Sequence, residues 1–216
     1  MRKKVIIFDL DGTLIDSVSD LAASVNFMLR SLNLSEVEEE RVREWVGNGA
    51  SMLVKRALGE KNIELFNRAI SIFLNYYENN LTSYTSLYPG VKEILQNLQD
   101  FKLSIVTNKP YRFIKPILEK LDIESYFDYY LGGDSLKEKK PHPMPLLKVC
   151  EEFGASADEA LMVGDSKNDI LAAKNAGMEC VGVCYGYNYG ENIENYSPDF
   201  IINDIKDLNK ILRREA

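Results

Sequence analysis

Residues 5–16 read Val-Ile-Ile-Phe-Asp-Leu-Asp-Gly-Thr-Leu-Ile-Asp, and this stretch sets the expectation for the fold. Its first four residues are a short apolar run, typical of a strand buried on both faces of a parallel sheet. Two carboxylates, Asp9 and Asp11, follow two residues apart, and Gly12 then turns the chain away. Because residues i and i+2 of a strand point to the same side, we expect both acids to face one site beyond the strand. Two carboxylates this close repel each other unless a cation offsets their charge, and their oxygens are ligands that a hard divalent cation such as Mg²⁺ prefers. The pair therefore favours a metal ion at that site.

The composition is that of a globular protein without a nucleic-acid or membrane signature. The 216 residues are 45% hydrophobic and 27% charged, with a formal net charge of −7. This length allows one large domain or a domain that carries an insertion. An acidic chain lacks the basic patches that phosphate backbones need, and no apolar run approaches the roughly 20 residues of a membrane helix. The start of the chain leaves no room for a signal peptide before the first strand, so we expect a cytoplasmic protein with neither nucleic-acid nor membrane partners.

Helical patterns follow the first strand. An apolar stripe at helical spacing contains Leu21, Val25, Met28, Leu29 and Leu32. Further helical stretches are expected at residues 38–46, 51–58 and 63–77, with glycines between them. We therefore expect residues 17–82 to form a small all-helical domain inserted after the first strand.

Strands and helices alternate in the remainder of the chain. Strands are expected at residues 103–107, 129–131, 160–163, 180–184 and 200–202, and helices at 91–99, 113–121, 145–153, 169–176 and after the last strand. This alternation predicts an α/β fold: a parallel sheet with right-handed crossovers and helices on both faces, built from residues 1–16 and 83–216. In such sheets the ligand site lies beyond the carboxyl ends of the strands.

Later strand ends carry polar side chains suited to phosphate chemistry. Thr107 offers a hydroxyl near the amides of the next helix, a place for phosphate oxygens, although the same residue can serve only as a helix cap. Lys140 lies in a basic run stiffened by prolines, so its ammonium can be aimed at a site; a solvated lysine is the alternative. Asp165 and Asp169 stand at a helix start, where acids often only cap the helix. Together with the paired acids after the first strand, these groups are the parts for phosphoryl transfer.

These segments, in this order, resemble the motifs of the haloacid dehalogenase superfamily. They read Asp9-Leu10-Asp11-Gly12-Thr13, Thr107-Asn108, Lys140-Pro141 and Gly164-Asp165-Ser166-Lys167-Asn168-Asp169. Shorter stretches at residues 45–50, 106–110, 139–143 and 186–191 are similar to superfamily members that hydrolyse 2-phosphoglycolate. The resemblance extends over nearly the whole chain. It implies a Rossmann-like core with a small helical cap, and a Mg²⁺-dependent hydrolase that acts on a small anionic phosphomonoester through an aspartyl-phosphate.

The resemblance implies a role for each acid of the motifs. Asp9 would be the nucleophile, and Asp11 would protonate the leaving alkoxide and later deprotonate the attacking water. The Mg²⁺ ligands would be Asp9, the backbone carbonyl of Asp11, and Asp165. Asp169 would support the metal from close by or through water.

The remaining matched positions would contact the substrate. Thr107, Asn108 and Lys140 would hold the phosphoryl oxygens, and Lys140 would also offset the charge on the nucleophile and take part in catalysis. In the helical insertion, Arg56 is a candidate for binding a substrate carboxylate, with a solvated helix face as the alternative reading.

Other activities remain open on the same fold. The substrate could be another small phosphomonoester or pyrophosphate, and a sugar-phosphate mutase would use the same Asp9 but return the phosphoryl group to a sugar. Haloacid dehalogenation is disfavoured because Asp11 and Gly12 suit acid–base work on an alkoxide. A non-catalytic binding protein is disfavoured by the intact set of acids. The sequence leaves open whether the chain is a monomer or a homodimer.

Overall fold

The computed structural model describes residues 3–213, and its main sheet is parallel throughout. The strand order is β5-β4-β1-β6-β7-β8. The strands are β1 (Val5–Phe8), β4 (Lys102–Val106), β5 (Tyr129–Leu131), β6 (Ala160–Gly164), β7 (Glu179–Val183) and β8 (Phe200–Ile202). In the register of the sheet, Phe8 lies between Ile105 of β4 and Val163 of β6. The predicted α/β fold class is confirmed, and β1 lies inside the sheet as its apolar sequence requires.

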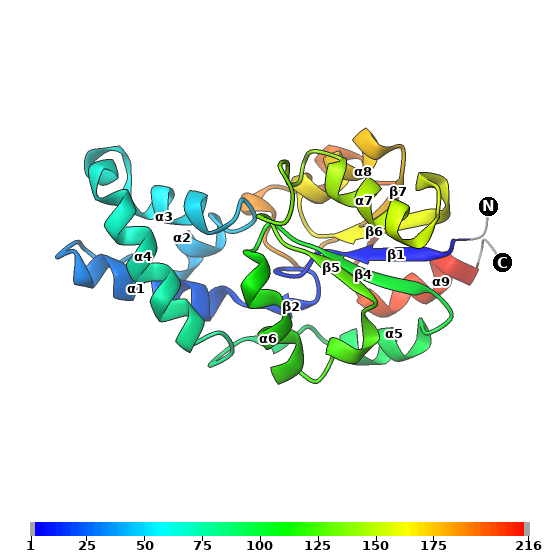
Figure 1. Cartoon of the computed structure of the whole chain (residues 1–216), viewed down its shortest axis with the longest axis horizontal. Helices are drawn as coiled ribbons and strands as arrows, with labels where there is room; N and C mark the ends of the chain where they lie inside the picture. Colours follow the sequence, from blue (N-terminus) through cyan, green and yellow to red (C-terminus); the bar gives the residue numbers. More distant parts are fainter. Residues whose placement is uncertain (1–2, 214–216) are drawn as a thin grey trace.

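Helices cover both faces of this sheet (Figure 1). They are α5 (Val91–Asn97), α6 (Ile114–Lys120), α7 (Met144–Phe153), α8 (Lys167–Ala176) and α9 (Leu208–Arg213). Ile6 and Phe8 of β1 pack in the apolar cluster that contains α5, α6 and α9, whereas Val5 and Ile7 pack in the cluster of α7 and α8. Alternate residues of a strand point to opposite faces, so the uninterrupted apolar run of β1 fills the core on both sides.

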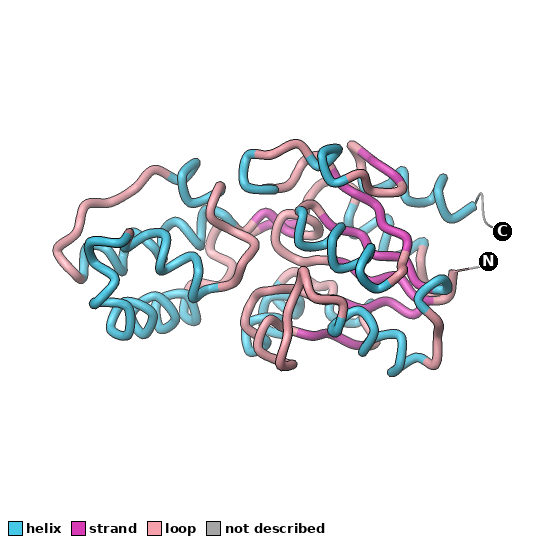
Figure 2. The backbone as a smooth tube through the Cα atoms, turned by 90° about the horizontal axis from the view of Figure 1, so that it is seen from above, coloured by secondary structure: helices cyan, strands magenta, loops and turns pink. Residues whose placement is uncertain are grey.

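A separate group of helices lies beyond the carboxyl end of β1 (Figures 1 and 2). It consists of α1 (Val18–Ser31), α2 (Glu39–Arg43), α3 (Ala50–Leu58) and α4 (Phe66–Asn79), with a 3-10 segment at Glu60–Leu65. Helix α1 packs against α4, and buried side chains such as Val25, Met28 and Phe73 lie in this helical group. All of these helices fall inside the range predicted from the sequence for the insertion.

Two crossings join the helical group to the sheet. They run side by side as a short antiparallel ribbon of β2 (Ile15–Asp16) and β3 (Ser86–Leu87). The buried carboxylate of Asp20 in α1 accepts hydrogen bonds from the amides of Tyr84 and Thr85 and from the Thr85 hydroxyl, the last at 2.6 Å. Asp20 therefore ties the start of α1 to the returning crossing.

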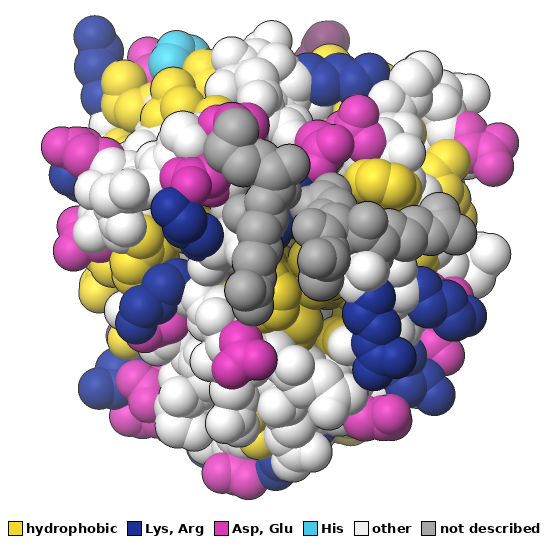
Figure 3. Space-filling model, turned by 90° about the vertical axis from the view of Figure 1, so that its right-hand side faces the viewer, with side chains coloured by type: hydrophobic (Ala, Val, Ile, Leu, Met, Phe, Trp, Pro, Cys, Tyr) yellow, Lys and Arg dark blue, Asp and Glu magenta, His cyan; other side chains and the backbone are white. Residues whose placement is uncertain are grey.

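The end of the core remote from the helical group carries paired charges. Lys4 pairs with Glu159, and Lys102 with Asp128, near the amino-terminal ends of the strands. Figure 3 views this end and shows basic and acidic side chains interspersed over it. Within residues 3–213, no helix is both long enough and apolar enough to cross a membrane.

Candidate active site

The sequence motifs meet at one edge of the sheet. Asp9, Thr107 and Asp165 are the first residues beyond β1, β4 and β6, which are neighbours in the sheet. The amide of Asp9 still donates to the carbonyl of Val163 at 2.9 Å, so strand pairing holds its backbone in place. Lys140 reaches the same edge from the segment between β5 and α7. Carboxyl ends of parallel strands share one edge, and residues far apart in the sequence therefore meet here.

Three buried carboxylates form a compact cluster at this edge. Asp9, Asp165 and Asp169 each present an oxygen within 4.8 Å of the others. Burial raises the pKa of Asp9 to about 7; the charge of Lys140 opposes this rise, and the charge of Asp169 adds to it. Burial, followed by the charges of Asp9 and Asp169, also raises the pKa of Asp165 well above its usual value. Like charges held this close away from water favour a bound cation.

The donor set of this cluster fits Mg²⁺, which prefers carboxylate oxygens. Asp9 Oδ1 is buried and lies 2.9 Å from Lys140 Nζ, and Asp9 is one of the three carboxylates that each present an oxygen within 4.8 Å of the others. Asp165 is oriented by the Thr13 hydroxyl at 3.0 Å and by the Tyr187 amide at 2.8 Å. Gly12 has a φ of +92°, and a Cβ there would collide with the Asp165 carboxylate. Glycine thus lets the chain turn tightly past the predicted metal ligands.

Asp169 connects the predicted phosphate-binding lysine to helix α8. Its Oδ1 accepts a hydrogen bond from Lys140 Nζ at 2.6 Å, and its Oδ2 accepts from the amide and hydroxyl of Ser166 at 3.0 and 2.8 Å. Because Ser166 and Asp169 cap each other in this way, α8 begins at Lys167 rather than at the predicted Asp169. Lys140 Nζ also lies 2.9 Å from Asp9 Oδ1, and its side chain is only 1% exposed. The lysine is therefore aimed at the acids and is not a solvated surface residue.

Asp11 lies apart from the three clustered carboxylates. Its Oδ1 accepts hydrogen bonds from Lys109 Nζ at 2.8 Å and from the hydroxyl of Ser17. The side chains of Asp9 and Asp11 line the same cavity, as expected, but the Asp11 carboxylate is not part of the cluster of Asp9, Asp165 and Asp169. Strand β1 ends at Phe8 and the chain turns directly afterwards, so the alternation of a strand no longer sets the direction of Asp11. Metal binding by the backbone carbonyl of Asp11 stays a prediction.

The two residues after β4 differ in what they contact. Thr107 is 3% exposed, and its hydroxyl oxygen accepts a hydrogen bond from the Lys109 amide at 3.2 Å. Asn108 donates to the carbonyls of Gly47 at 2.8 Å and Lys140 at 3.0 Å, and its buried Oδ1 accepts no hydrogen bond from any of residues 3–213. The Asn108 side chain thus links the helical group to the Lys140 segment, and the contact of Asn108 with phosphate stays a prediction.

Arg56 does not line the cavity beside these acids. Its guanidinium donates to the carbonyl of Trp45 at 2.6 Å and to Asn48 Oδ1 at 2.7 Å. It also lies over the ring of Tyr189, 5.5 Å from the centroid. Neither a solvated helix face nor a free cation describes this residue: Arg56 holds the loop of residues 47–49 against the core. The suggestion that it binds a substrate carboxylate has no support in this geometry.

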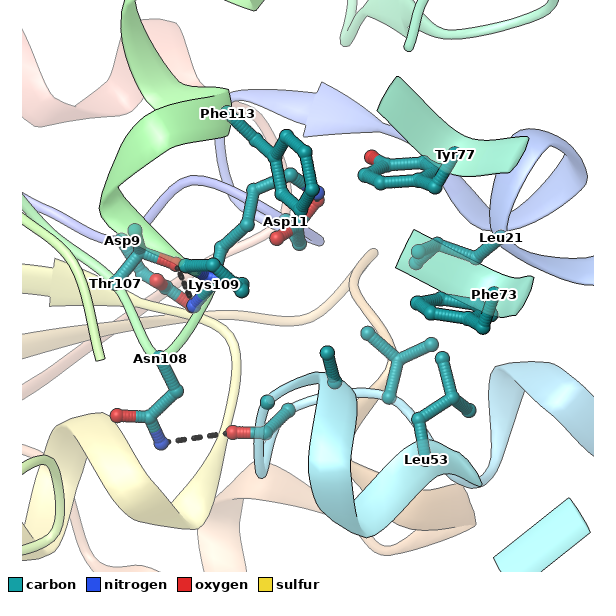
Figure 4. A pocket seen from close by; sticks show the side chains of 15 residues that line it. Asp9, Asp11, Leu21, Leu53, Phe73, Tyr77, Thr107, Asn108, Lys109 and Phe113 are labelled. Carbon is teal, nitrogen blue, oxygen red and sulfur yellow. Dashed lines mark hydrogen bonds and ion pairs between the residues drawn. The ribbon is translucent and has the colours of Figure 1, made fainter. Parts of the chain in front are cut away.

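A small cavity lies between the strand ends and the helical group (Figure 4). Polar residues of the strand ends, including Asp9, Asp11 and Thr107, line one side, and apolar residues such as Leu53 and Phe73 face them from the helices. The cavity measures about 40 Å³, which corresponds to roughly three water-sized groups at ~10–15 Å³ each. This space suits a small substrate whose reactive end lies at Asp9.

Two polar side chains of this cavity were not predicted from the sequence, those of Lys109 and Tyr77. Lys109 pairs with Asp11, and Tyr77 of α4 lies beside it, with the Lys109 ammonium 4.8 Å from the ring centroid. A signal for Lys109 was present, because it precedes Pro110 after a strand, just as Lys140 precedes Pro141. Nothing in the local sequence singled out Tyr77, whose place depends on how α4 sits over the strand ends.

The fold and the candidate site define an α/β protein with buried carboxylates and a lysine clustered at the carboxyl ends of parallel strands. The chain belongs to the haloacid dehalogenase-like hydrolase family, whose model matches residues 6–183. It is 44% identical to the phosphoglycolate phosphatase of Colwellia psychrerythraea, over 99% of this chain and 98% of that protein. It is 46% identical to the phosphoglycolate phosphatase of Photorhabdus laumondii, over 95% and 90% of the two chains. The crystal structure of a predicted phosphoglycolate phosphatase from Haemophilus somnus superposes with a TM-score of 0.93, at 43% identity and 98% coverage of both chains.

Proposed function

We propose that this chain is a Mg²⁺-dependent phosphatase that converts 2-phosphoglycolate to glycolate and phosphate through an aspartyl-phosphate on Asp9. The observation that carries the proposal is the buried Asp9 carboxylate, which faces Lys140 within a cluster of acids suited to Mg²⁺. Phosphate esters and carboxylates are both anionic, so attack requires local positive charge to offset their repulsion. Mg²⁺ held by Asp9, Asp165 and the Asp11 carbonyl would supply that charge, together with Lys140.

In the first step, an oxygen of Asp9 attacks phosphorus, and the bond from phosphorus to the glycolate oxygen breaks. Asp11 gives its proton to that oxygen, so the leaving group departs as an alcohol. Within the described chain, both hydrogen bonds to the Asp11 carboxylate fall on Oδ1, which leaves Oδ2 to carry the proton. The Thr107 hydroxyl and the following amides hold the phosphoryl oxygens as charge moves onto them.

In the second step, a water molecule attacks the phosphorus of the aspartyl-phosphate. Asp11, now a carboxylate, takes a proton from that water, and the bond from phosphorus to Asp9 breaks. Phosphate leaves, and both aspartates return to their starting state. Lys140 remains charged throughout, since its pKa is raised by Asp169 and Asp9 even though burial opposes the charge.

The choice of 2-phosphoglycolate rests on two observations. Relatives that match this chain over nearly its full length carry the name phosphoglycolate phosphatase. The wall that the helical group turns toward Asp9 is apolar, so it offers few partners for the hydroxyl groups of the sugar that a mutase would have to hold.

We also propose that residues 17–82 act as a cap that closes over a core of residues 1–16 and 83–216. The loop of residues 47–49 supports this, since the Gly47 carbonyl accepts hydrogen bonds from Asn108 at 2.8 Å and from Asn168 at 3.0 Å. Both donors belong to the core, next to the reactive groups. Closure excludes water while the phosphoryl group is transferred.

Phosphate release from 2-phosphoglycolate, measured with Mg²⁺ and with EDTA, tests the proposed function. We expect release only with Mg²⁺, and a higher kcat/KM for 2-phosphoglycolate than for phosphoserine, pyrophosphate or glucose 1-phosphate. Asp9→Asn should abolish release, whereas Asp100→Asn, at an exposed position, should leave it unchanged. Absence of metal-dependent release from every ester would refute a phosphatase. Interconversion of sugar phosphates without free phosphate would indicate a mutase instead.

A further inference from the structure

Lys109 carries a buried positive charge at the cavity. Its side chain is 3% exposed, and within residues 3–213 its hydrogen-bond acceptor is Asp11 Oδ1 at 2.8 Å. The side chain is therefore an ammonium at neutral pH, with N–H groups left over after its bond to Asp11.

Tyr77 adds an unsatisfied polar group next to this charge. The residue is 1% exposed and lines the cavity, and its hydroxyl lies beside the Lys109 ammonium. Among residues 3–213, nothing accepts a hydrogen bond from its buried O–H group. The Lys109 ammonium lies 4.8 Å from the centre of its ring. Buried hydroxyls normally have partners, because an unsatisfied one costs free energy. The N–H groups of Lys109 that remain after its bond to Asp11 and the O–H group of Tyr77 thus lie close enough together to donate to one acceptor in the cavity.

The charges of the cavity show which acceptor is missing. Among the described residues that line it, Lys109 is the one cation, against the acids Asp9 and Asp11. The phosphoryl end of a substrate has its own cation in Lys140, which lies 2.9 Å from Asp9 Oδ1 and does not line the cavity. The rest of the wall is mainly apolar, so it offers no water-like shell to a second anionic group. Lys109 pairs with Asp11 and, with its remaining N–H groups, is the cation that can also meet a negative charge on the leaving group.

We propose that Lys109 and the Tyr77 hydroxyl form a subsite for the carboxylate of the substrate and so select phosphomonoesters of small hydroxy acids. This inference rests on the proposed phosphatase function and assigns the recognition of the acid group to residues outside the sequence motifs. An ester without the carboxylate leaves the Tyr77 hydroxyl and the Lys109 donors unpaired in an apolar cavity. Sites built to bind a polar group discriminate strongly against analogues that lack it.

The test compares 2-phosphoglycolate with its carboxamide, in which an uncharged group of the same size replaces the carboxylate. We expect the wild-type enzyme to prefer the carboxylate in kcat/KM by about 30-fold or more, the order expected for loss of a charged hydrogen bond. Lys109→Met should lower kcat/KM for 2-phosphoglycolate by about 30-fold more than for the carboxamide, because the loss of the Lys109–Asp11 pair affects both substrates alike. Tyr77→Phe should lower only the value for 2-phosphoglycolate, by about 3- to 10-fold. Lys92→Met, at an exposed lysine, is the matched control.

Binding to the Asp9→Asn variant, measured by calorimetry, separates this inference from the proposed activity because it needs no turnover. Adding Lys109→Met to that variant should weaken binding of 2-phosphoglycolate by about 30-fold and leave binding of the carboxamide unchanged. Equal losses for both compounds, or no loss for either, would overturn the subsite, and a selectivity unchanged in Tyr77→Phe would remove the tyrosine from it. A wild-type enzyme that hydrolyses phosphomonoesters without preferring the carboxylate would refute the subsite and leave the phosphatase standing. An enzyme inactive on all esters but with the expected binding would refute only the activity.

Discussion

Replacing Asp9 by asparagine should stabilise the metal-free protein while it abolishes turnover. Burial, with a contribution from Asp169, raises the pKa of Asp9 from 3.8 to about 7 despite the nearby Lys140. Each pKa unit corresponds to 1.36 kcal/mol, so the ionised carboxylate lowers the stability of the metal-free fold by up to about 4 kcal/mol. Asparagine has nearly the same shape as the protonated acid and carries no charge, so it removes this cost.

The effect should depend on pH in a defined direction. Below pH 3.8 the carboxyl group is protonated in both the folded and the unfolded chain, and it costs nothing. Between pH 3.8 and about 7 the unfolded chain gives up this proton first, so the stability of the wild-type protein falls as the pH rises. Above pH 7 the full cost is present. The stability difference between Asp9→Asn and wild type should therefore grow from pH 4 to pH 8.

Urea and thermal unfolding in EDTA measure this difference. Even if relaxation halves the cost, about 2 kcal/mol remains at pH 8, or a rise in Tm of about 4–8 °C for a chain of this length. Saturating Mg²⁺ should narrow the gap, because the cation stabilises the ionised wild-type cluster. Asp100→Asn removes an exposed charge and should leave Tm unchanged. An Asp9→Asn variant no more stable than wild type at pH 8 in EDTA, or a gap independent of pH, would refute this account of the acid cluster.

Three further changes test other parts of the structure. Lys140→Met removes the cation that faces the nucleophile, so it should lower kcat by at least about 100-fold in steady-state assays. A loss of kcat below about 10-fold would contradict that role. Asp20→Ala leaves the buried Thr85 donors without their acceptor, so it should lower the free energy of urea unfolding by about 2–5 kcal/mol. An unchanged free energy would show that the crossing that returns to the sheet does not depend on this carboxylate. Asn168→Ala removes one of the two side-chain hydrogen bonds to the Gly47 carbonyl, so it should raise KM about 3- to 10-fold with a smaller change in kcat. An unchanged KM would argue against cap closure through the loop of residues 47–49.

The order of elements could be predicted from the sequence because each depends on short-range patterns. The apolar run at Val5–Phe8, the alternation after residue 83 and the helical stripe of α1 each arise from a local period of hydrophobicity. The observed boundaries of an element differ from the predicted ones where a side chain caps that element. Helix α8 starts at Lys167 because Ser166 and Asp169 cap each other, a contact that the sequence allows but does not require.

The meeting of Asp9, Thr107 and Asp165 could likewise be predicted, because the ends of adjacent parallel strands must lie at one edge. The direction of side chains beyond those ends could not. Asp11 follows a turn, where the alternation of a strand no longer applies, and so its pairing with Lys109 was missed. Arg56 was an exposed candidate in the helical pattern, yet the position of the loop over the core determines its bonds.

The sequence by itself determined the class of fold, the acids and the lysine of the candidate site, and the edge of the sheet where they meet. Only the tertiary structure decided how the cavity is completed. Tyr77 comes from α4 and Lys109 from the segment after β4, and their proximity depends on how the helical group rests on the strand ends. The pairing of parallel strands places the residues that follow each strand at one edge of the sheet, and the strands themselves can be recognised from local sequence patterns. Contacts between two separately packed layers depend on the shape of both surfaces, which no local pattern records.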